Sequence, residues 1–340
     1  MRSIFFEIGT AFTLLRLSLA FSPSSSHRRC SSIKSSELYS HNPTHDPVLI
    51  TFDLDDTLFP ISPVIKDANN ALLQILSEMG YDAITEESMI ASSKEIRQEL
   101  REEGIVVTYT ELRKKAIERE MLKLRSTNSF GSVIPRHVIE KLYNVWETER
   151  HLAAERHLFS DTIDMLDCLL ELIPGVSIGA ITNGKGDPFA MKKTIDTYFD
   201  FCVSGEDDGV FPSRKPHSGI YEAALNKYWN LQKCDAVDAE KLIWIHVGDD
   251  LANDVGGSQK VGAKSIFVDL NESYGQAAGK RFTSSSSGKD ELHVPAWSTI
   301  SKEEAEKREV LNREALTLAS GTVRTLKSLP LIVADIIKEK

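Results

Sequence analysis

The stretch VLITFDLDDTL, residues 48–58, decides the fold of this chain. Its first half is short, apolar and rich in β-branched residues, which is typical of a buried parallel strand. Asp53 and Asp55 follow this strand directly. In an open α/β sheet, ligands bind at the carboxyl ends of the strands, and alternation places both carboxylates on one side of the extended chain. An active site is therefore expected at this point.

Four more apolar runs follow along the chain, and helical segments separate most of them. Alternating strand and helix signals predict an α/β fold, a doubly wound parallel sheet of the Rossmann-like kind. The four further strands are expected within residues 176–181, 201–203, 242–247 and 265–268.

Residues 62–157 lack a strand-rich stretch, and their apolar residues recur at helical spacing. We predict a helical cap domain over this interval, inserted into a core domain made of residues 46–61 and 158–340. The expected helices are the stripe from Ile65 to Met79, residues 111–125, residues 135–156 and a charged surface helix at 301–318.

The first 45 residues differ in composition from the rest. Residues 4–21 are apolar but contain Glu7 and Arg16, so a stable membrane span is not expected. A serine-rich basic stretch follows, and the junction LAFSP at residues 19–23 resembles the cleavage site of leaders that direct proteins to complex algal plastids. We predict a cleavable targeting leader at residues 1–45 with a plastid address; a mitochondrial or secretory leader is the alternative.

The bulk composition excludes some classes of function. The net charge of −10 argues against a nucleic-acid partner, because nucleic-acid binding relies on lysine and arginine to neutralise phosphates. The four cysteines are scattered without paired CxxC spacing, so we expect reduced thiols rather than a zinc or redox site. The sequence gives no indication of oligomeric state.

The aspartate cluster admits two interpretations. Adjacent carboxylates repel each other, so Asp53 and Asp55 suit either a metal site or a nucleophile beside a general acid. The alternative is an acidic turn that caps the next helix through Asp56 or Thr57.

Three later segments favour the first interpretation. ITNG at residues 181–184 places Thr182 and Asn183 at a strand end. SRKP at 213–216 opens an expected helix, where Lys215 and free backbone amides would face an anion. HVGDD at 246–250 ends a strand and is followed by Asp254. Each segment alone has a structural explanation, but their order predicts one site that binds an anion and a metal ion.

These segments are similar to the four motifs of the haloacid dehalogenase-like superfamily, at residues 53–57, 182, 215 and 248–254. The resemblance spans roughly residues 47–270 and includes the inserted helical cap. It implies that Asp53 attacks phosphorus and that Asp55 protonates the leaving oxygen and later activates water. It also implies that Thr182, Asn183 and Lys215 bind the phosphate oxygens.

The resemblance further implies a Mg²⁺ cofactor. Asp53, the backbone carbonyl of Asp55, and Asp249 would hold the ion. Asp254 or Asp250 would bond to its waters.

The resemblance points to a small phosphorylated metabolite as the partner. True dehalogenases of the family lack an aspartate at the position of Asp55, so its presence favours phosphate esters. The motif wording resembles the phosphatases of 5-amino-6-(5-phosphoribitylamino)uracil in riboflavin synthesis. The alternatives are a nucleotide, flavin mononucleotide or sugar-phosphate phosphatase, a phosphomutase, and a non-catalytic binding protein. Substrate contacts are expected in the cap, and the candidates are Arg113, Lys114, Arg119, Trp146 and His151. The alternative is that these side chains belong to solvated helix faces or to the core of the cap.

Overall fold

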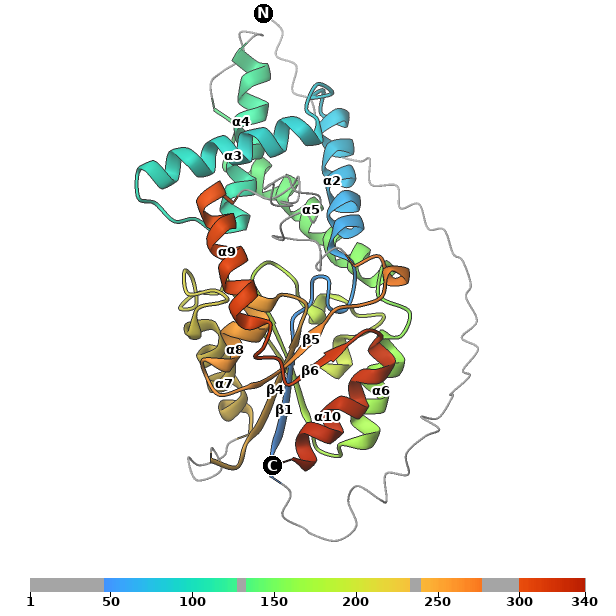
Figure 1. Cartoon of the computed structure of the whole chain (residues 1–340). Coiled ribbons are helices and arrows are strands. Elements are labelled where there is room, and N and C mark those ends of the chain that lie inside the picture. The colour runs from blue at the N-terminus through green and yellow to red at the C-terminus, as the bar shows by residue number, and fades with distance from the viewer. Residues whose placement is uncertain (1–45, 127–132, 233–239, 277–299, 340) are drawn as a thin grey trace, which may run out of the picture.

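A parallel sheet forms the centre of the computed structural model, which describes residues 46–126, 133–232, 240–276 and 300–339 (Figure 1). The expected leader lies outside these residues. The six strands pair in the order β3-β2-β1-β4-β5-β6, and every pair is parallel. The strands are β1 (Val48–Phe52), β2 (Ser177–Thr182), β3 (Phe201–Ser204), β4 (Ile243–Gly248), β5 (Lys264–Val268) and β6 (Gly321–Val323).

The strand order reverses beside β1. The chain runs outward from β1 through β2 to β3, and then returns to the other side of β1 with β4. Ligands of doubly wound sheets bind at such a reversal, outside the carboxyl ends of the strands. The segments that begin at Asp53 and Asp249 leave the sheet on the two sides of this point. The predicted fold class is therefore confirmed.

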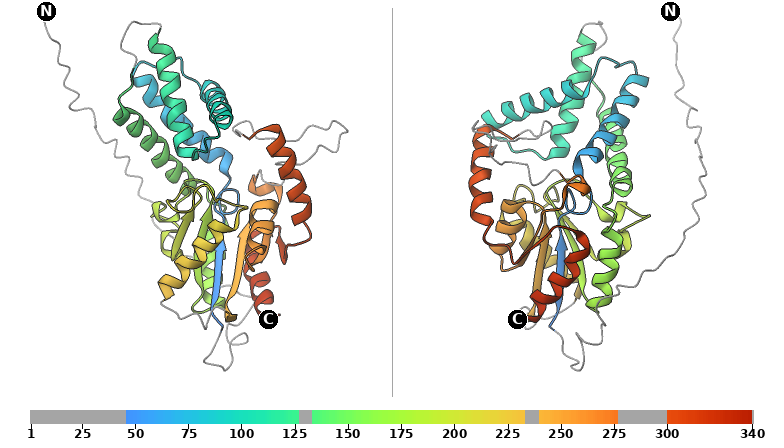
Figure 2. Two further views of the ribbon diagram at one scale, coloured as in Figure 1. Left: turned by 90° about the vertical axis from the view of Figure 1, so that its left-hand side faces the viewer. Right: turned by 45° about the vertical axis from the view of Figure 1, so that its right-hand side comes forward.

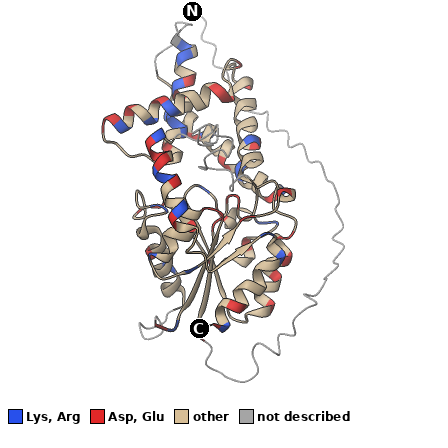
Figure 3. Cartoon of the chain, in the orientation of Figure 1, with Lys and Arg blue, Asp and Glu red and all other residues tan. Residues whose placement is uncertain are grey.

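Helices cover both faces of the sheet (Figure 1). Successive residues of a strand point to opposite faces, so Ile50 packs with the cluster under α6 and α10 while Leu49 packs with the cluster under α7. Figure 3 shows that the middle of the sheet carries almost no charged residues. The helices are α6 (Thr162–Leu172), α7 (Ser218–Gln232), α8 (Gly257–Gln259) and α10 (Leu329–Lys338).

Four further helices form a separate body over the carboxyl ends of the strands (Figures 1 and 2). They bury a hydrophobic cluster of their own, which includes Leu72, Ile117 and Trp146. The helices are α2 (Ile61–Glu78), α3 (Glu86–Glu102), α4 (Tyr109–Ser126) and α5 (Arg136–Arg156), and we call them the cap helices.

Helix α9 (Lys302–Ala315) links the two bodies (Figure 2). It packs against the π-helical turn η4 (Leu251–Gly256), and its Glu304 forms a 2.8 Å ion pair with Arg101 of α3. A helix expected only to cover the surface therefore connects the core to the cap helices. Among the described helices, none is long and apolar enough to cross a membrane.

Candidate active site

In the loop after β1, Asp53 and Asp56 have different roles. The Asp53 N–H donates to the Val247 carbonyl at 2.8 Å, which fixes the start of the loop to β4. Asp56 has a φ of 61°, a left-handed conformation that aspartate tolerates better than most residues, and its carboxylate accepts the N–H of Ile61 at the start of α2. The helix-capping interpretation thus applies to Asp56, and the Asp53 side chain remains available to the site.

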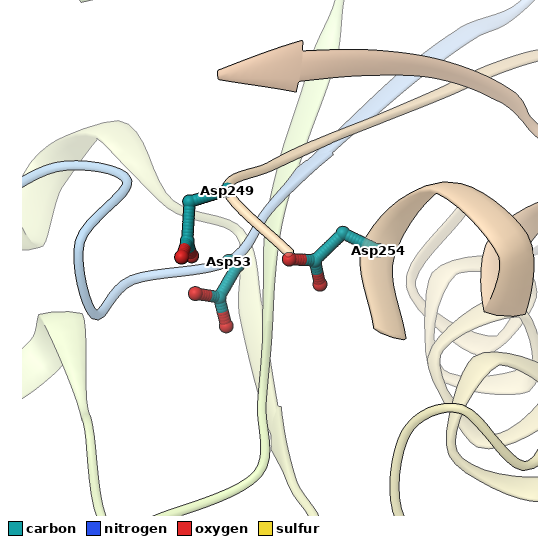
Figure 4. A group of neighbouring side chains, drawn as sticks. All are labelled: Asp53, Asp249 and Asp254. Atoms are coloured by element: carbon teal, nitrogen blue, oxygen red, sulfur yellow. The ribbon is translucent and has the colours of Figure 1, made fainter. Parts of the chain in front are cut away.

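Three buried carboxylates meet at the reversal point of the sheet. Asp53, Asp249 and Asp254 each offer an oxygen atom, and these atoms lie within 4.8 Å of one another. Asp53 and Asp249 follow adjacent strands, and Asp254 reaches them from η4 (Figure 4). Oxygen ligands in such a group match the donor set that Mg²⁺ prefers.

Lys215 lies against this group and is 4% exposed. Its ammonium donates to Asp53 at 2.5 Å, to Asp254 at 2.7 Å and to the Ile181 carbonyl at 2.8 Å. One ammonium group balances one negative charge, so the two carboxylates that it contacts, Asp53 and Asp254, leave an excess of negative charge. A bound divalent cation would neutralise that excess.

The electrostatics of this centre agree with the charge count. Burial raises the pKa of Asp53 to about 7, although the nearby Lys215 opposes the rise. Burial disfavours the charged form of Lys215, but the attraction of Asp254 and Asp53 outweighs burial and raises the pKa of Lys215. The lysine therefore keeps its charge, while Asp53 is a carboxylate that needs further positive charge to stay ionised.

The segment 213–216 was predicted to open a helix, and helix α7 begins two residues after it, at Ser218. Lys215 itself lies outside the helix, because a residue that precedes a proline, here Pro216, is disfavoured in the helical conformation. The Lys215 N–H donates to Asn183 Oδ1 at 2.8 Å, and Asn183 Nδ2 donates to the Lys215 carbonyl at 3.0 Å. The Lys215 backbone amide is therefore occupied by Asn183, whose side chain positions Lys215. That Asn183 also binds phosphate stays a prediction.

Asp254 is held by contacts on three sides. It approaches Gly248 so closely that a Cβ there would lie 2.3 Å from the Asp254 carboxyl carbon. The Asp254 carboxylate also accepts hydrogen bonds from the Asp250 N–H at 2.9 Å and from His246 Nε2 at 3.2 Å. Asp250 itself forms an ion pair with Arg308 of α9. Asp254 and Asp250 were the two residues expected to bond to the waters of the metal ion. Asp254 lies in the group of buried carboxylates, whereas Asp250 is directed toward α9.

His246 is fully buried in β4 and was not among the predicted site residues. Trp244 Nε1 donates to Thr51 Oγ1 at 2.9 Å, so the Thr51 hydroxyl proton is free to donate to His246 Nδ1 at 2.8 Å. His246 then carries its proton on Nε2 and donates to Asp254. Burial lowers the pKa of His246, which favours this neutral form. The signal in the sequence was a polar residue inside an apolar strand.

Thr182 and Asp249 complete the group of expected residues. Thr182 is the last residue of β2 and is 1% exposed. Asp249 accepts the Thr57 hydroxyl at 3.2 Å, which orients its carboxylate. Both side chains line the same cavity as Asp53.

Asp55 has a partner that sequence analysis also missed. Arg150 of α5 donates from Nη2 to both carboxylate oxygens of Asp55, at 2.7 and 3.0 Å. Arg150 is 2% exposed and continues the buried face of α5 beyond Trp146. A charged residue at an apolar helical position was the signal that could have found it.

A cavity of about 590 Å³ extends from the carboxylates to the cap helices. Arg113 and Trp146 line it, with the guanidinium carbon 3.7 Å from the centroid of the indole ring. The other cap candidates lie elsewhere. Lys114 pairs with Glu140, Arg119 pairs with Glu99, and His151 Nε2 donates to the Lys185 carbonyl.

Comparison with known proteins agrees with this geometry. The chain is 27% identical over 221 residues to the 5-amino-6-(5-phospho-D-ribitylamino)uracil phosphatase YigB of Escherichia coli, which covers 64% of this chain and 82% of that protein. It is 26% identical over 227 residues to the ribulose-1,5-bisphosphate 5-phosphatase of Halopiger xanaduensis, covering 66% of this chain and 85% of that protein.

A solved structure shares the fold. The 2-haloacid dehalogenase of Pseudomonas syringae pv. Tomato matches with a TM-score of 0.55 and 22% identity, over 85% of this chain and 99% of that one. The family model of haloacid dehalogenase-like hydrolases matches residues 48–262, which include β1 to β4 and every carboxylate of the site. The chain therefore belongs to the haloacid dehalogenase-like hydrolase family.

Proposed function

We propose that this chain is a magnesium-dependent phosphomonoester hydrolase that works through an aspartyl phosphate on Asp53. The observation that carries the proposal is the buried Asp53 carboxylate, in contact with Lys215 and facing two further carboxylates at the reversal point of the sheet. A nucleophile, a cation and a metal-binding group in one place are the requirements of phosphoryl transfer.

In the first step, a carboxylate oxygen of Asp53 attacks phosphorus, and the bond between phosphorus and the ester oxygen breaks. Lys215 and the Thr182 hydroxyl stabilise the negative charge on the other phosphate oxygens. Asp55 gives its proton to the departing oxygen, which leaves as an alcohol.

In the second step, Asp55 takes a proton from water, and the resulting hydroxide attacks the same phosphorus. The bond between phosphorus and Asp53 breaks, which releases inorganic phosphate and restores the Asp53 carboxylate. The proton that Asp55 took from water restores its acid form, so the site is ready for another cycle.

In this proposal Asp53, Asp249 and the backbone carbonyl of Asp55 would hold the ion, and Asp254 would bond to its waters. Bound Mg²⁺ supplies positive charge to the phosphate oxygens and to the Asp53 carboxylate. The oxygens of Asp53, Asp249 and Asp254, which lie within 4.8 Å of one another, support a metal ion at this place.

For the substrate, we propose 5-amino-6-(5-phosphoribitylamino)uracil, and for the location a plastid. The E. coli relative, the wording of the motifs and the cavity support this substrate. A volume of about 590 Å³ has room for a pyrimidine joined to a ribityl chain, and Trp146 offers an aromatic surface. The Halopiger relative makes ribulose 1,5-bisphosphate the second candidate.

A panel of phosphomonoesters tests this proposal. The panel contains both candidates, flavin mononucleotide, a nucleoside monophosphate and glucose 1-phosphate, assayed with and without EDTA. We expect the ribityl substrate to have a kcat/KM at least about tenfold above the others, since a site that hydrogen-bonds its substrate discriminates by at least this factor. Activity that survives EDTA would contradict the metal assignment, and conversion of glucose 1-phosphate to glucose 6-phosphate would indicate a mutase.

Arg308 is expected to support metal binding from α9. Its guanidinium contacts Asp250 and the side-chain oxygen of Asn253, which brace the turn that carries Asp254. Residues that hold metal ligands in place commonly change metal affinity by about 10–100-fold when replaced. We expect Arg308→Met to raise the Mg²⁺ concentration for half-maximal activity by about that factor.

Arg313→Met on the same helix is the matched control, because the Arg313 side chain is 74% exposed. A magnesium titration of each variant checks the prediction. Equal Mg²⁺ requirements in the two variants would show that α9 does not support the metal site.

A further inference from the structure

Arg150 is the residue that the proposed chemistry leaves unexplained. It belongs to a cap helix, yet its guanidinium reaches the loop after β1 and contacts both carboxylate oxygens of Asp55. The Arg150 side chain is 3% exposed, whereas the Asp55 side chain is 27% exposed. The cap helices therefore contribute a buried group to the core site, directly on the proposed general acid.

The second terminal nitrogen of Arg150 has a different environment. Nη1 is buried and has no hydrogen-bond partner among the residues that the structure describes. Arg150 also lines the cavity that contains Asp53 and Thr182. An ideal Cβ built on Gly186 would lie 3.4 Å from Arg150 Nη2 and 3.5 Å from Thr182 Oγ1, so the guanidinium and this hydroxyl both face the backbone of Gly186.

A buried donor without a partner costs free energy comparable to a lost hydrogen bond. A group that arrives with the substrate would remove this cost, and the neighbouring Thr182 is already expected to bind a phosphate oxygen. The planar guanidinium can serve two acceptors at once, because its donors form a fixed fork.

We propose that Arg150 is a positioning residue that acts through Asp55. When Asp55 carries its proton, Nη2 donates to one oxygen of the carboxyl group only, so that the other oxygen, which carries the proton, is turned toward the leaving oxygen. Nη1 donates to an oxygen of the bound ester. Proton transfer to the leaving group then depends on the seating of α5 over the core. This inference rests on the proposed phosphatase function.

Leaving groups separate this role from simple phosphate binding. p-Nitrophenolate leaves readily without a proton, whereas an alkoxide does not, so a group that acts through the general acid matters mainly for alkyl esters. A residue that only binds phosphate would affect both kinds of ester equally, because the phosphate is the same.

The experiment compares p-nitrophenyl phosphate with ribitol 5-phosphate on the full chain. We expect Arg150→Met to lower kcat for ribitol 5-phosphate by about 100-fold, the usual contribution of a general acid, and for p-nitrophenyl phosphate by less than about 5-fold. Arg150→Lys keeps the charge but loses the fork, and its loss on the alkyl ester is expected to be intermediate. Arg136→Met on the same helix, with its side chain 90% exposed, is the control and should match the unmodified chain.

The ratio of the two rates is the decisive quantity, because partial misfolding lowers both rates together. Arg150→Met combined with Asp55→Asn should be slower on the alkyl ester than Asp55→Asn alone by less than about 5-fold, because both changes remove the proton transfer and only the contact of Nη1 with the ester is left to lose. An equal loss on both esters, or multiplicative losses in the double variant, would overturn the inference. Failure of the proposed function is recognised separately, by an Asp53→Asn variant that still hydrolyses p-nitrophenyl phosphate.

Discussion

Asp53→Asn is expected to lower kcat on any phosphomonoester by at least about 10⁴-fold, the scale found when a covalent nucleophile is removed. Asparagine has nearly the same shape as aspartate but cannot form an aspartyl phosphate. The comparison is a steady-state assay of phosphate release with saturating Mg²⁺. Asp335→Asn, at an exposed position of α10, is the matched control and should keep full activity.

The same substitution is expected to stabilise the fold in metal-free buffer. Burial raises the folded-state pKa of Asp53 from 3.8 to about 7. Ionisation of Asp53 therefore costs more free energy in the folded state than in the unfolded state, and this lowers the stability of the fold. The destabilisation is absent below the unfolded-state pKa and grows as the pH rises through the window between the two values. The melting temperature of Asp53→Asn should therefore exceed that of the unmodified chain at pH 8 with EDTA, and the two should converge near pH 4. A lower melting temperature at pH 8 would contradict this electrostatic account.

Lys215→Met is the second change with a large expected effect. Without the ammonium, the phosphate oxygens lose a charged donor, and kcat should fall by about 10²–10³-fold. Lys215 also contacts two buried carboxylates, and removal of one partner from a buried ion pair costs about 3–5 kcal/mol. In EDTA we expect the melting temperature to fall by roughly 6–20 °C, from about 2–4 °C per kcal/mol.

Added Mg²⁺ should restore part of that stability, because the ion binds the folded state and supplies the missing positive charge. Lys264→Met, at an exposed position of β5, is the control for loss of a lysine. The two central substitutions should thus shift stability in opposite directions. An increase in melting temperature for Lys215→Met would show that the lysine does not neutralise the carboxylates.

The sheet could be predicted because its strands are continuous apolar runs. Five of the strands lie close to such runs in the sequence, since both faces of a parallel strand are buried. β6 was missed because Gly321–Val323 is a run of three residues with one apolar side chain. Helix α3 was missed because its buried positions, Met89, Ser92 and Ile96, give a sparse pattern that includes a serine.

The site residues that directly follow a strand could be predicted from the sequence. Asp53, Thr182 and Asp249 each follow a strand directly, so chain order alone brings them to one edge of the sheet. Arg150 and Arg308 are different, because they come from helices and reach the site by packing of the cap helices and α9. Sequence spacing can mark Arg150 as a charged residue on an apolar helical face, but it does not say which core residue Arg150 or Arg308 contacts.

Rapid acid quench during turnover, followed by peptide mass spectrometry, tests the central claim about Asp53 most directly. Acid stops the reaction and preserves acyl phosphates long enough for analysis. The proposed mechanism predicts one phosphate on the peptide that contains Asp53, formed from substrate in the presence of Mg²⁺ and absent in Asp53→Asn. Steady turnover with no phosphate on that peptide, or phosphate on another residue, would contradict it.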